Sequence, residues 1–320
     1  MTSKTKSKLI NSDIKTLFKR AGIDGVTQIK ALDTGEYNAV CQVTAAEKEY
    51  VIKIAPPPGL PVLRYEQNLM SSELAWYEKV AAHTSITLPH IHFLDLTATA
   101  AHSGYFIMDR LPGRALNEMK LSVTEKKNAT SAMAEMAAQI HKIKNDKFGY
   151  IQTGLHSNWH QAIRAMTSNI INDAKKVNKP LKDGLELLAH IDRHQETLEA
   201  AECTMVNFDI HSANVIANAN NYAMVDLERS FWGDPVAELV NLEMMLPLEE
   251  KTISIAAYNK LADTPIELTK ETKIRYAIAL GYLGLIMGTE RFYRYTRLNS
   301  GWWRNKLAQR IFLKRAFKSL

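Results

Sequence analysis

Three oxygen-bearing side chains bracket a β-like segment in the second half of the sequence. Asp209 ends one apolar run, Asn214 opens the next run five residues later, and Asp226 ends the run after that. A carboxylate or amide at the end of a strand lies at the strand mouth, so three such groups from adjacent ends can converge. Mg²⁺ takes hard oxygen ligands, commonly one or two carboxylates together with phosphate oxygens. The spacing therefore suits phosphoryl transfer, with Asn214 and Asp226 on the metal and Asp209 accepting the proton of an acceptor hydroxyl.

The Asp-x-x-x-x-Asn pattern is weak by itself, because surface residues, helix caps and salt bridges produce it too. A lysine in the first part of the chain strengthens the interpretation. Lys53 lies within the apolar run Val-Ile-Lys-Ile, where its ammonium needs a partner. Glu73, in a helical pattern twenty residues further on, is a candidate partner. The backbone of Thr34 and Gly35 could approach phosphates, although an ordinary hairpin turn fits residues 34–38 equally well.

The elements expected in the first part of the chain form a small β-rich lobe. Residues 8–20 and 64–81 have helical periodicity. Short runs of alternating and β-branched residues predict an antiparallel meander, with strands at 26–32, 37–44 and 49–54, followed by further runs at 91–96 and 105–108. Pro112-Gly113 then breaks the chain, so we place a hinge at 109–113.

Beyond the hinge the pattern is helical. Ser122 and Glu125 have the spacing of a capping box, and further helices are expected at 157–177, 181–200, 235–260 and 269–295. The β-like segment interrupts them with runs at 204–208, 214–217 and 222–225. This order predicts an α+β fold with two lobes, residues 1–108 and 114–320.

Composition narrows the class of protein. The 320 residues are 46% hydrophobic and 23% charged, which suits a globular chain with a sizeable core. Cys41 and Cys203 form no disulfide framework, so we expect a reducing compartment and a cytoplasmic location. The N-terminus has no signal-peptide pattern. The longest apolar stretch, residues 276–287, is too short to span a bilayer, so we expect no membrane contact.

The net charge of +6 is unevenly distributed, because no acidic residue follows Glu290 while nine lysines and arginines do. A solvated helix face is the preferred interpretation. Binding to nucleic acid or to a membrane surface is the minority alternative, and no zinc-ligand spacing or basic region with heptads supports nucleic-acid binding.

The motifs together resemble the aminoglycoside phosphotransferase and choline kinase-like family, a branch of the protein-kinase-like fold. The resemblance runs in order from about Gly25 to about Glu290. Its most specific part is Asp209-Ile-His-Ser-Ala-Asn214 followed by Val-Asp226-Leu-Glu and Trp-Gly-Asp-Pro235. It implies a small N-terminal lobe with an antiparallel sheet and one helix, and a larger helical lobe.

The resemblance also implies roles for individual residues. Asp209 would be the catalytic base, while Asn214 and Asp226 would hold Mg²⁺. Lys53 would contact the nucleotide phosphates and pair with Glu73, with Glu66 as the alternative partner. The segment 105–111 resembles the hinge strand whose backbone meets the adenine, so Met108, Asp109 and Leu111 are expected to contact the base. Thr34 and Gly35 remain candidate phosphate contacts from their place in the turn, because the family's phosphate loop is variable and gives no motif to match.

One departure from the family pattern concerns the catalytic loop. The family usually has a histidine two residues before the catalytic aspartate, and here that residue is Asn207. Asparagine offers a donor and an acceptor, so it could replace the bracing role of the histidine in part. The departure leaves open a catalytically weak nucleotide-binding protein.

The acceptor site is expected beside Asp209 in the helical lobe. Acidic residues after the metal loop would suit an amino-sugar or quaternary-amine acceptor, although Asp234 and Glu238 are better placed to cap or brace a helix start. Tryptophans could line a cation site, but core packing is preferred for Trp159, Trp232, Trp302 and Trp303. His190 and His194 have helical ligand spacing without a third ligand, so a solvated helix is preferred.

The sequence thus predicts a kinase that uses Mg²⁺ and transfers the γ-phosphate of ATP or GTP to a small alcohol. Its expected partners are the nucleotide and the acceptor, with no nucleic acid. An aminoglycoside, choline or ethanolamine, and homoserine remain open as acceptors, and fold-level analogy does not choose among them.

Overall fold

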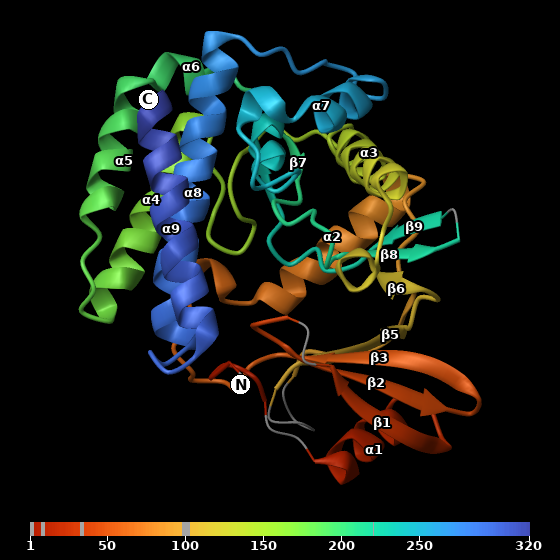
Figure 1. The fold of residues 1–320 in the computed structure, drawn as a ribbon. Coiled ribbons are helices and arrows are strands. Elements are labelled where there is room, and N and C mark those ends of the chain that lie inside the picture. The colour runs from red at the N-terminus through yellow and green to blue at the C-terminus, as the bar shows by residue number, and fades with distance from the viewer. Residues whose placement is uncertain (1–2, 8–9, 33–34, 98–102, 220) are drawn as a thin grey trace. The chain divides into compact units, whose positions relative to one another are not determined.

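The computed structural model describes residues 3–7, 10–32, 35–97, 103–219 and 221–320 (Figure 1). By its internal contacts the chain divides into two units. The first unit contains residues 1–62, 89–112 and 292–302, and the second contains residues 63–88, 113–291 and 303–320. The fold is mixed α+β, as the sequence predicts. The assignment of a nucleotide lobe to 1–108 and of an acceptor site to 114–320 stays a prediction.

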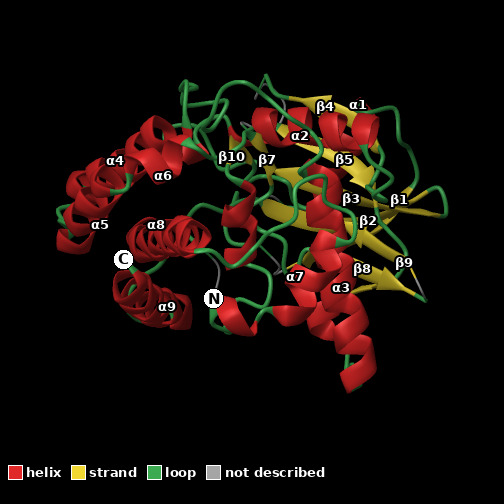
Figure 2. Cartoon of the chain, turned by 90° about the horizontal axis from the view of Figure 1, so that it is seen from above, coloured by secondary structure: helices red, strands yellow, loops and turns green. Residues whose placement is uncertain are grey.

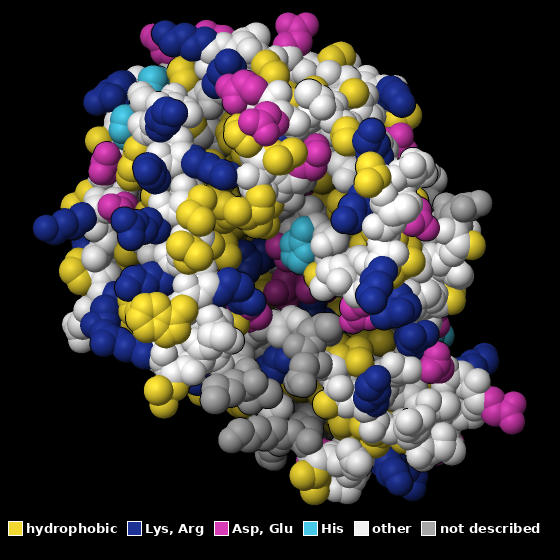
Figure 3. All heavy atoms as spheres, in the orientation of Figure 1, with side chains coloured by type: hydrophobic (Ala, Val, Ile, Leu, Met, Phe, Trp, Pro, Cys, Tyr) yellow, Lys and Arg dark blue, Asp and Glu magenta, His cyan; other side chains and the backbone are white. Residues whose placement is uncertain are grey.

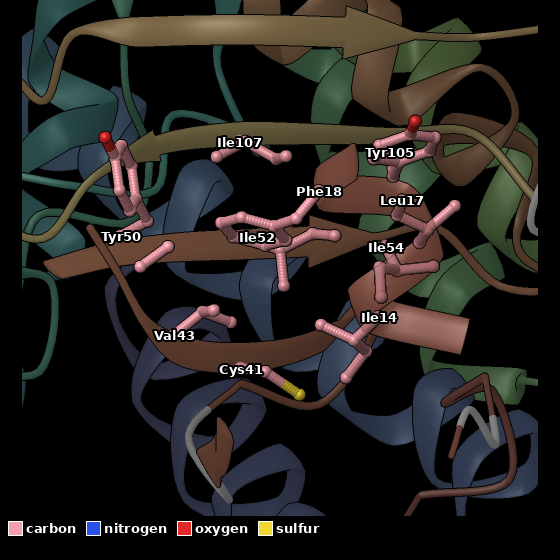
Figure 4. Close-up of a cluster of buried hydrophobic side chains, with 11 residues drawn as sticks. Ile14, Leu17, Phe18, Cys41, Val43, Tyr50, Ile52, Ile54, Tyr105 and Ile107 are labelled. Atoms are coloured by element: carbon pink, nitrogen blue, oxygen red, sulfur yellow. The ribbon is translucent and has the colours of Figure 1, made fainter. Parts of the chain in front are cut away.

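The first unit is built on a five-stranded antiparallel sheet in the order β1-β2-β3-β5-β4. Its strands lie close to the predicted runs: β1 (Val26–Leu32), β2 (Ala39–Ala45), β3 (Lys48–Ile54), β4 (Ile91–Asp95) and β5 (Tyr105–Asp109). Helix α1 (Asn11–Arg20) covers one face of this sheet (Figure 4). Its buried side chains Ile14, Leu17 and Phe18 pack in one cluster with Ile52 and Ile107.

The β2–β3 hairpin turns through Ala46 and Glu47. Both have positive φ, 46° and 62°, as a two-residue type I′ turn requires at its central positions. The register follows directly, because Ala45 pairs with Lys48 and Val40 pairs with Lys53. This turn therefore fixes where Lys53 lies along β3.

The second unit is mostly helical. Its helices are α2 (Leu69–His83), α3 (Val123–Ile140), α4 (Trp159–Lys176), α5 (Lys182–Arg193), α6 (Gln195–Glu199), α7 (Thr252–Asn259) and the larger parts of α8 (Lys270–Arg294) and α9 (Ser300–Ser319). The predicted capping box at α3 is confirmed, since the Ser122 hydroxyl accepts from the Glu125 amide and the Glu125 carboxylate accepts from the Ser122 amide.

Helices α8 and α9 lie side by side in the second unit (Figures 1 and 2). Glycines permit this close approach, since a Cβ on Gly288 would lie 2.4 Å from the Gln309 side chain and one on Gly284 would lie 3.2 Å from Leu313. None of the helices in the described residues is long and apolar enough to cross a membrane.

Two small sheets complete the second unit. The strands β6 (Arg114–Ala115), β8 (Val215–Asn218) and β9 (Asn221–Met224) pair antiparallel in the order β6-β8-β9. Strand β7 (Thr204–Val206) pairs with β10 (Phe231–Gly233), which was not predicted. With only three residues, β10 is too short to show alternation in the sequence.

The predicted helix at 235–260 is wrong over most of its length. Residues Pro235–Val240 and Leu248–Glu250 are 3₁₀ helices, and only Thr252–Asn259 is α-helical. Glu243 has φ 49°, which ends helical geometry, and Pro247 cannot donate within a helix. The predicted helix at 181–200 divides into α5 and α6 at His194.

Both cysteines are free and buried. Burial raises the pKa of each thiol, and that of Cys203 rises to about 12. Neither thiol is therefore a reactive thiolate at neutral pH.

Gly113 is the position in the second unit where a side chain would be least tolerated. Its φ is +113°, and a Cβ would lie 2.2 Å from the Ala217 carbonyl oxygen. We expect Gly113→Ala to lower the free energy of unfolding by about 3 kcal/mol or more, measured by urea denaturation. Gly154→Ala is the matched control, because Gly154 has φ +104° with no atom within 4 Å of the Cβ position. Equal losses in the two variants would contradict the steric explanation.

Candidate active site

The β8–β9 hairpin brings the three residues of the first motif to one of its own ends. Val215 pairs with Met224, and the Val225 amide donates to the Asn214 carbonyl oxygen at 3.0 Å. Asn214 and Asp226 therefore flank the same end of the hairpin. The Asn214 side-chain amide donates to the Asp209 carboxylate at 3.0 Å and to its carbonyl oxygen at 3.1 Å. The predicted convergence of Asp209 and Asn214 is thus a direct contact.

Helix α2 adds a carboxylate to this end of the hairpin. The side-chain oxygens of Glu73, Asp226 and Glu228 all lie within 4.8 Å of one another. The Asp226 amide also donates to the Tyr77 hydroxyl of α2 at 2.9 Å. Carboxylate oxygens at this spacing fit a divalent cation that prefers hard ligands. It is the one such group of three or more acidic, histidine or cysteine side chains in the described residues, and it excludes His190 and His194.

Two non-glycine residues beside these groups have left-handed backbone conformations. Phe208 has φ 59° and Asp226 has φ 67°. Such conformations cost about 1–3 kcal/mol and persist where the surroundings hold them. They occur at the residue before Asp209 and at Asp226 itself, so the candidate site is a place where the fold imposes an uncommon geometry.

The carboxylate of Glu238 holds the loop that carries Asp209. One of its oxygens accepts from the Asn207 amide at 2.7 Å and the other accepts from the Phe208 amide at 3.0 Å. The Asn241 side chain donates to the Phe208 carbonyl oxygen at 2.6 Å. Both sides of the left-handed residue are therefore held by the 3₁₀ helix Pro235–Val240 and its C-cap residue Asn241.

Asp234 caps a helix start, as expected, whereas Glu238 holds the Asn207–Phe208 loop instead of a helix start. The Asp234 carboxylate accepts from the Val236 amide at 3.0 Å and so caps the 3₁₀ helix. Glu238 braces the preceding loop. Neither is free to serve as a cationic acceptor's counter-charge, since both side chains are 1% exposed.

Asn207 supplies part of the bracing expected of the family histidine. It is 1% exposed, and its side-chain oxygen accepts from the Asp209 amide at 2.9 Å. The loop conformation at Asp209 is therefore supported in this chain even though the histidine is missing.

Positive charge surrounds Asp209. The Arg229 guanidinium lies 3.8 Å from its carboxylate, and His211 Nε2 lies 3.5 Å away. Burial alone would raise the pKa of Asp209, but Arg229, His211 and Asn214 outweigh burial and hold it below its ordinary value. Burial alone would lower the pKa of His211, and the hydrogen bond and charge of Asp209 raise it instead. Asp209 is therefore ionised at neutral pH.

Arg229 is itself held by a buried acid. Its guanidinium donates to Glu290 at 2.9 Å, and the Tyr65 hydroxyl donates to the same carboxylate oxygen at 2.6 Å. The Glu290 side chain is 1% exposed. This network, which no local sequence pattern indicated, sets the position of the positive charge beside Asp209.

Lys53, the candidate phosphate-binding residue, belongs to the first unit, whereas its candidate partners belong to the second. Lys53 is 5% exposed on β3, between Ile52 and Ile54 in the sheet. Glu73 belongs to the second unit, so its pairing with Lys53 stays a prediction. The alternative, Glu66, is buried and accepts from the Leu63 amide at 2.9 Å to cap a 3₁₀ helix, Arg64–Glu66.

The phosphate-loop and hinge candidates also remain predictions. Thr34 lies outside the described residues, and Gly35 has φ +77°. Met108 is 8% exposed on β5, and the Asp109 carboxylate contacts His92 Nε2 at 2.6 Å. Leu111 follows β5 and is partly buried.

Core packing explains most of the candidate aromatic residues. Trp159 stacks on Phe231 at 5.7 Å between ring centroids, and Trp232 packs edge-on against Trp76 at 5.0 Å. Trp302 is also buried, whereas Trp303 is 53% exposed on α9.

A profile of the phosphotransferase enzyme family matches residues 28–263. The chain belongs to this family. The match includes Asp209, Asn214, Asp226 and Glu238. A search of curated proteins finds no match.

Solved structures share the fold of this phosphotransferase. A provisionally assigned fructosamine-3-kinase from Haemophilus somnus 129PT has a TM-score of 0.66 at 16% identity, covering 96% of each chain. A provisionally assigned aminoglycoside phosphotransferase from Ralstonia eutropha JMP134 has a TM-score of 0.63 at 13% identity, covering 97% of this chain and 99% of that one. A thermostable APH(4)-Ia variant in ternary complex with AMP-PNP and hygromycin B has a TM-score of 0.61 at 16% identity, covering 94% and 97%. At these identities the likeness shows the kinase-like fold.

Replacing Glu238 tests whether this carboxylate stabilises the Asn207–Phe208 loop. We expect Glu238→Ala to lower the free energy of unfolding by about 3 kcal/mol, because the buried amides of Asn207 and Phe208 lose their acceptor. Urea denaturation measures the loss, and hydrogen exchange should show faster exchange at those two amides. Glu125→Ala, which removes an exposed capping carboxylate, is the control and should cost about 1 kcal/mol or less. Unchanged exchange at both amides would contradict this role.

Proposed function

We propose that this phosphotransferase transfers the γ-phosphate of ATP or GTP to a hydroxyl group of a small molecule. The observation that carries the proposal is the contact between ionised Asp209 and Asn214 at the hairpin end that also carries Asp226. A carboxylate in this position can orient the acceptor hydroxyl and accept its proton late in the transfer. Because Arg229 and His211 keep Asp209 ionised, the proton acceptor is available at neutral pH.

The carboxylates around Asp226 support a metal-assisted reaction. Asn214 and Asp226 would hold Mg²⁺, with Glu73 and Glu228 within reach of the same ion. Bound there, Mg²⁺ would neutralise charge on the nucleotide phosphates. Asn214 would have a second task, because its amide also donates to the Asp209 carboxylate and so restricts the orientation of that carboxylate.

The nucleotide contacts belong to the first unit in this proposal. Lys53 would bind the α- and β-phosphates, Thr34 and Gly35 would approach them through the backbone, and Met108, Asp109 and Leu111 would meet the base. A related fold, the APH(4)-Ia variant, binds AMP-PNP, and another variant of it binds ADP. Those complexes favour an adenine nucleotide here, while GTP stays open.

The acceptor is the open part of the proposal. Aminoglycosides, choline or ethanolamine, homoserine and other small alcohols fit the reaction equally. The deciding experiment is a nucleoside diphosphate release assay with ATP and GTP across a panel of these alcohols. Acceptor-dependent release of nucleoside diphosphate supports the proposal. If the protein binds nucleotide but no acceptor in the panel causes release, a non-catalytic nucleotide-binding protein is favoured.

Asp209 tests the proposed chemistry directly. We expect Asp209→Asn to lower kcat by about 10²–10⁴-fold, because the group acts mainly in the transition state. Nucleotide affinity, measured by calorimetry, should change less than about threefold. Asp146→Asn, an exposed carboxylate elsewhere in the second unit, is the matched control and should retain full activity. Unchanged kcat in Asp209→Asn would remove this residue from the mechanism.

The charge beside Asp209 predicts a change in pH dependence. Arg229 lowers the pKa of Asp209, so its removal should move the acidic limb of the kcat/KM profile to higher pH. The test variant is Arg229→Gln combined with Glu290→Gln, because Arg229→Gln alone would leave a buried carboxylate without its cation.

Glu290→Gln alone is the control for that double variant. It keeps Arg229 beside Asp209 and removes the competing acid, so the acidic limb should stay where it is or move to lower pH. If Arg229 lowers the pKa of Asp209, the two variants therefore shift the acidic limb of the kcat/KM profile differently. Identical profiles in both would show that Arg229 does not set the ionisation of Asp209.

A further inference from the structure

The outward face of α9 combines large apolar side chains with cations. Trp303, Leu307, Arg310 and Lys314 recur at intervals of four, three and four residues, so they share one face of the helix. All four are exposed, and Trp303 and Leu307 are 53% and 59% exposed. Because the tryptophan and leucine lie one turn apart, they form one apolar patch bordered by cations, and apolar patches rimmed by polar residues mark interaction sites.

The opposite face of α9 explains why these side chains remain outside. Phe312, Leu313 and Ala316 are buried, and Gln309 packs against Gly288 of α8. The helix is therefore anchored by its inner face, and rotation would expose that face. Trp303 and Leu307 cannot reach the core without dismantling the α8–α9 contact.

All charged side chains on α9 are basic. Cations flank the two apolar side chains, and no acidic residue occurs between residues 291 and 320. The Lys306 ammonium lies 4.9 Å from the centre of the Trp303 ring, and Arg304 is exposed on the other side. Figure 3 shows basic side chains gathered over the region of α9 with hydrophobic side chains among them. The surface is complementary to a partner that is anionic and apolar together.

We propose that the outward face of α9 docks this protein on an anionic phospholipid bilayer. Its cations would contact the lipid phosphates, while Trp303 and Leu307 would enter the boundary between headgroups and acyl chains, where such side chains are stabilised. A nucleic acid would also satisfy the cations, but it gives no reason for an exposed leucine beside the tryptophan. The sequence led us to expect no membrane contact, because it does not show which side chains of α9 are exposed.

Vesicle co-sedimentation with the full-length protein tests this inference. The probes are neutral phosphatidylcholine vesicles and vesicles with about 30% phosphatidylglycerol. We expect binding to the anionic vesicles alone at about 50 mM salt, and its loss at about 500 mM salt, where screening is strong. Absence of binding to the anionic vesicles at low salt, or equal binding to both kinds, would overturn the inference.

Two variant pairs separate the charge from the apolar contribution. Arg310→Glu with Lys314→Glu should weaken binding at least about tenfold, and Trp303→Ser with Leu307→Ser at least about fivefold. The control for charge is Lys126→Glu with Lys127→Glu, two exposed lysines on α3. The control for the apolar contribution is Leu185→Ser, a 60% exposed leucine on α5. Both controls should bind as the wild type does, and all variants should keep its melting temperature.

A single-stranded oligonucleotide serves as the competing probe. If it binds more tightly than the vesicles, and Trp303→Ser with Leu307→Ser leaves its binding unchanged, then the surface recognises nucleic acid and the lipid inference is wrong. The assay needs no acceptor or nucleotide, so its outcome is independent of the proposed kinase activity.

Discussion

The candidate site depends on one buried carboxylate that accepts two consecutive backbone amides. The Glu238 carboxylate accepts from the backbone amides of Asn207 and Phe208, and the Asn241 side chain donates to the carbonyl oxygen of Phe208. Together they hold a phenylalanine in a left-handed conformation that it would otherwise leave. Because Asp209 is the next residue, its direction is set by these bonds and by the bond from its own amide to Asn207. With Asn207 in place of the family histidine, the loop is thus still held by hydrogen bonds with Glu238, Asn241 and Asn207 itself.

Electrostatics then gives the positioned carboxylate its charge. A buried aspartate tends toward the neutral form, yet Arg229 and His211 lie within 4 Å of Asp209 and favour the anion. Glu290 and Tyr65 fix the guanidinium in turn. The acids Glu73, Asp226 and Glu228 lie on the same hairpin end and on α2. The hairpin, helix α2 and the loops beside them therefore bring together an ionised carboxylate, a supporting cation and a group of carboxylate oxygens.

The sequence predicted much of this arrangement because its signals are local. The strands of the first unit and the capping box of α3 follow from periodicity and short-range chemistry, and the contact of Asp209 with Asn214 follows from strand ends. Prediction from the sequence failed where the local structure depends on residues that are distant in the chain. The 235–260 helix is broken at Glu243 and Pro247, and β10 exists only because β7 pairs with it. Arg229 pairs with Glu290, and Glu238 binds the amides of Asn207 and Phe208. In both cases the partners are far apart in the sequence, so no short-range pattern predicts the contact.

The burial of both cysteines has a practical consequence for studying this protein. Cys41 lies in the α1–sheet cluster and Cys203 is buried with its pKa raised to about 12. A maleimide reagent at neutral pH attacks thiolates, so the native chain offers almost no background reaction. A single cysteine introduced on an exposed helix position would therefore carry a fluorophore or spin label at one known place, without prior removal of the natural thiols.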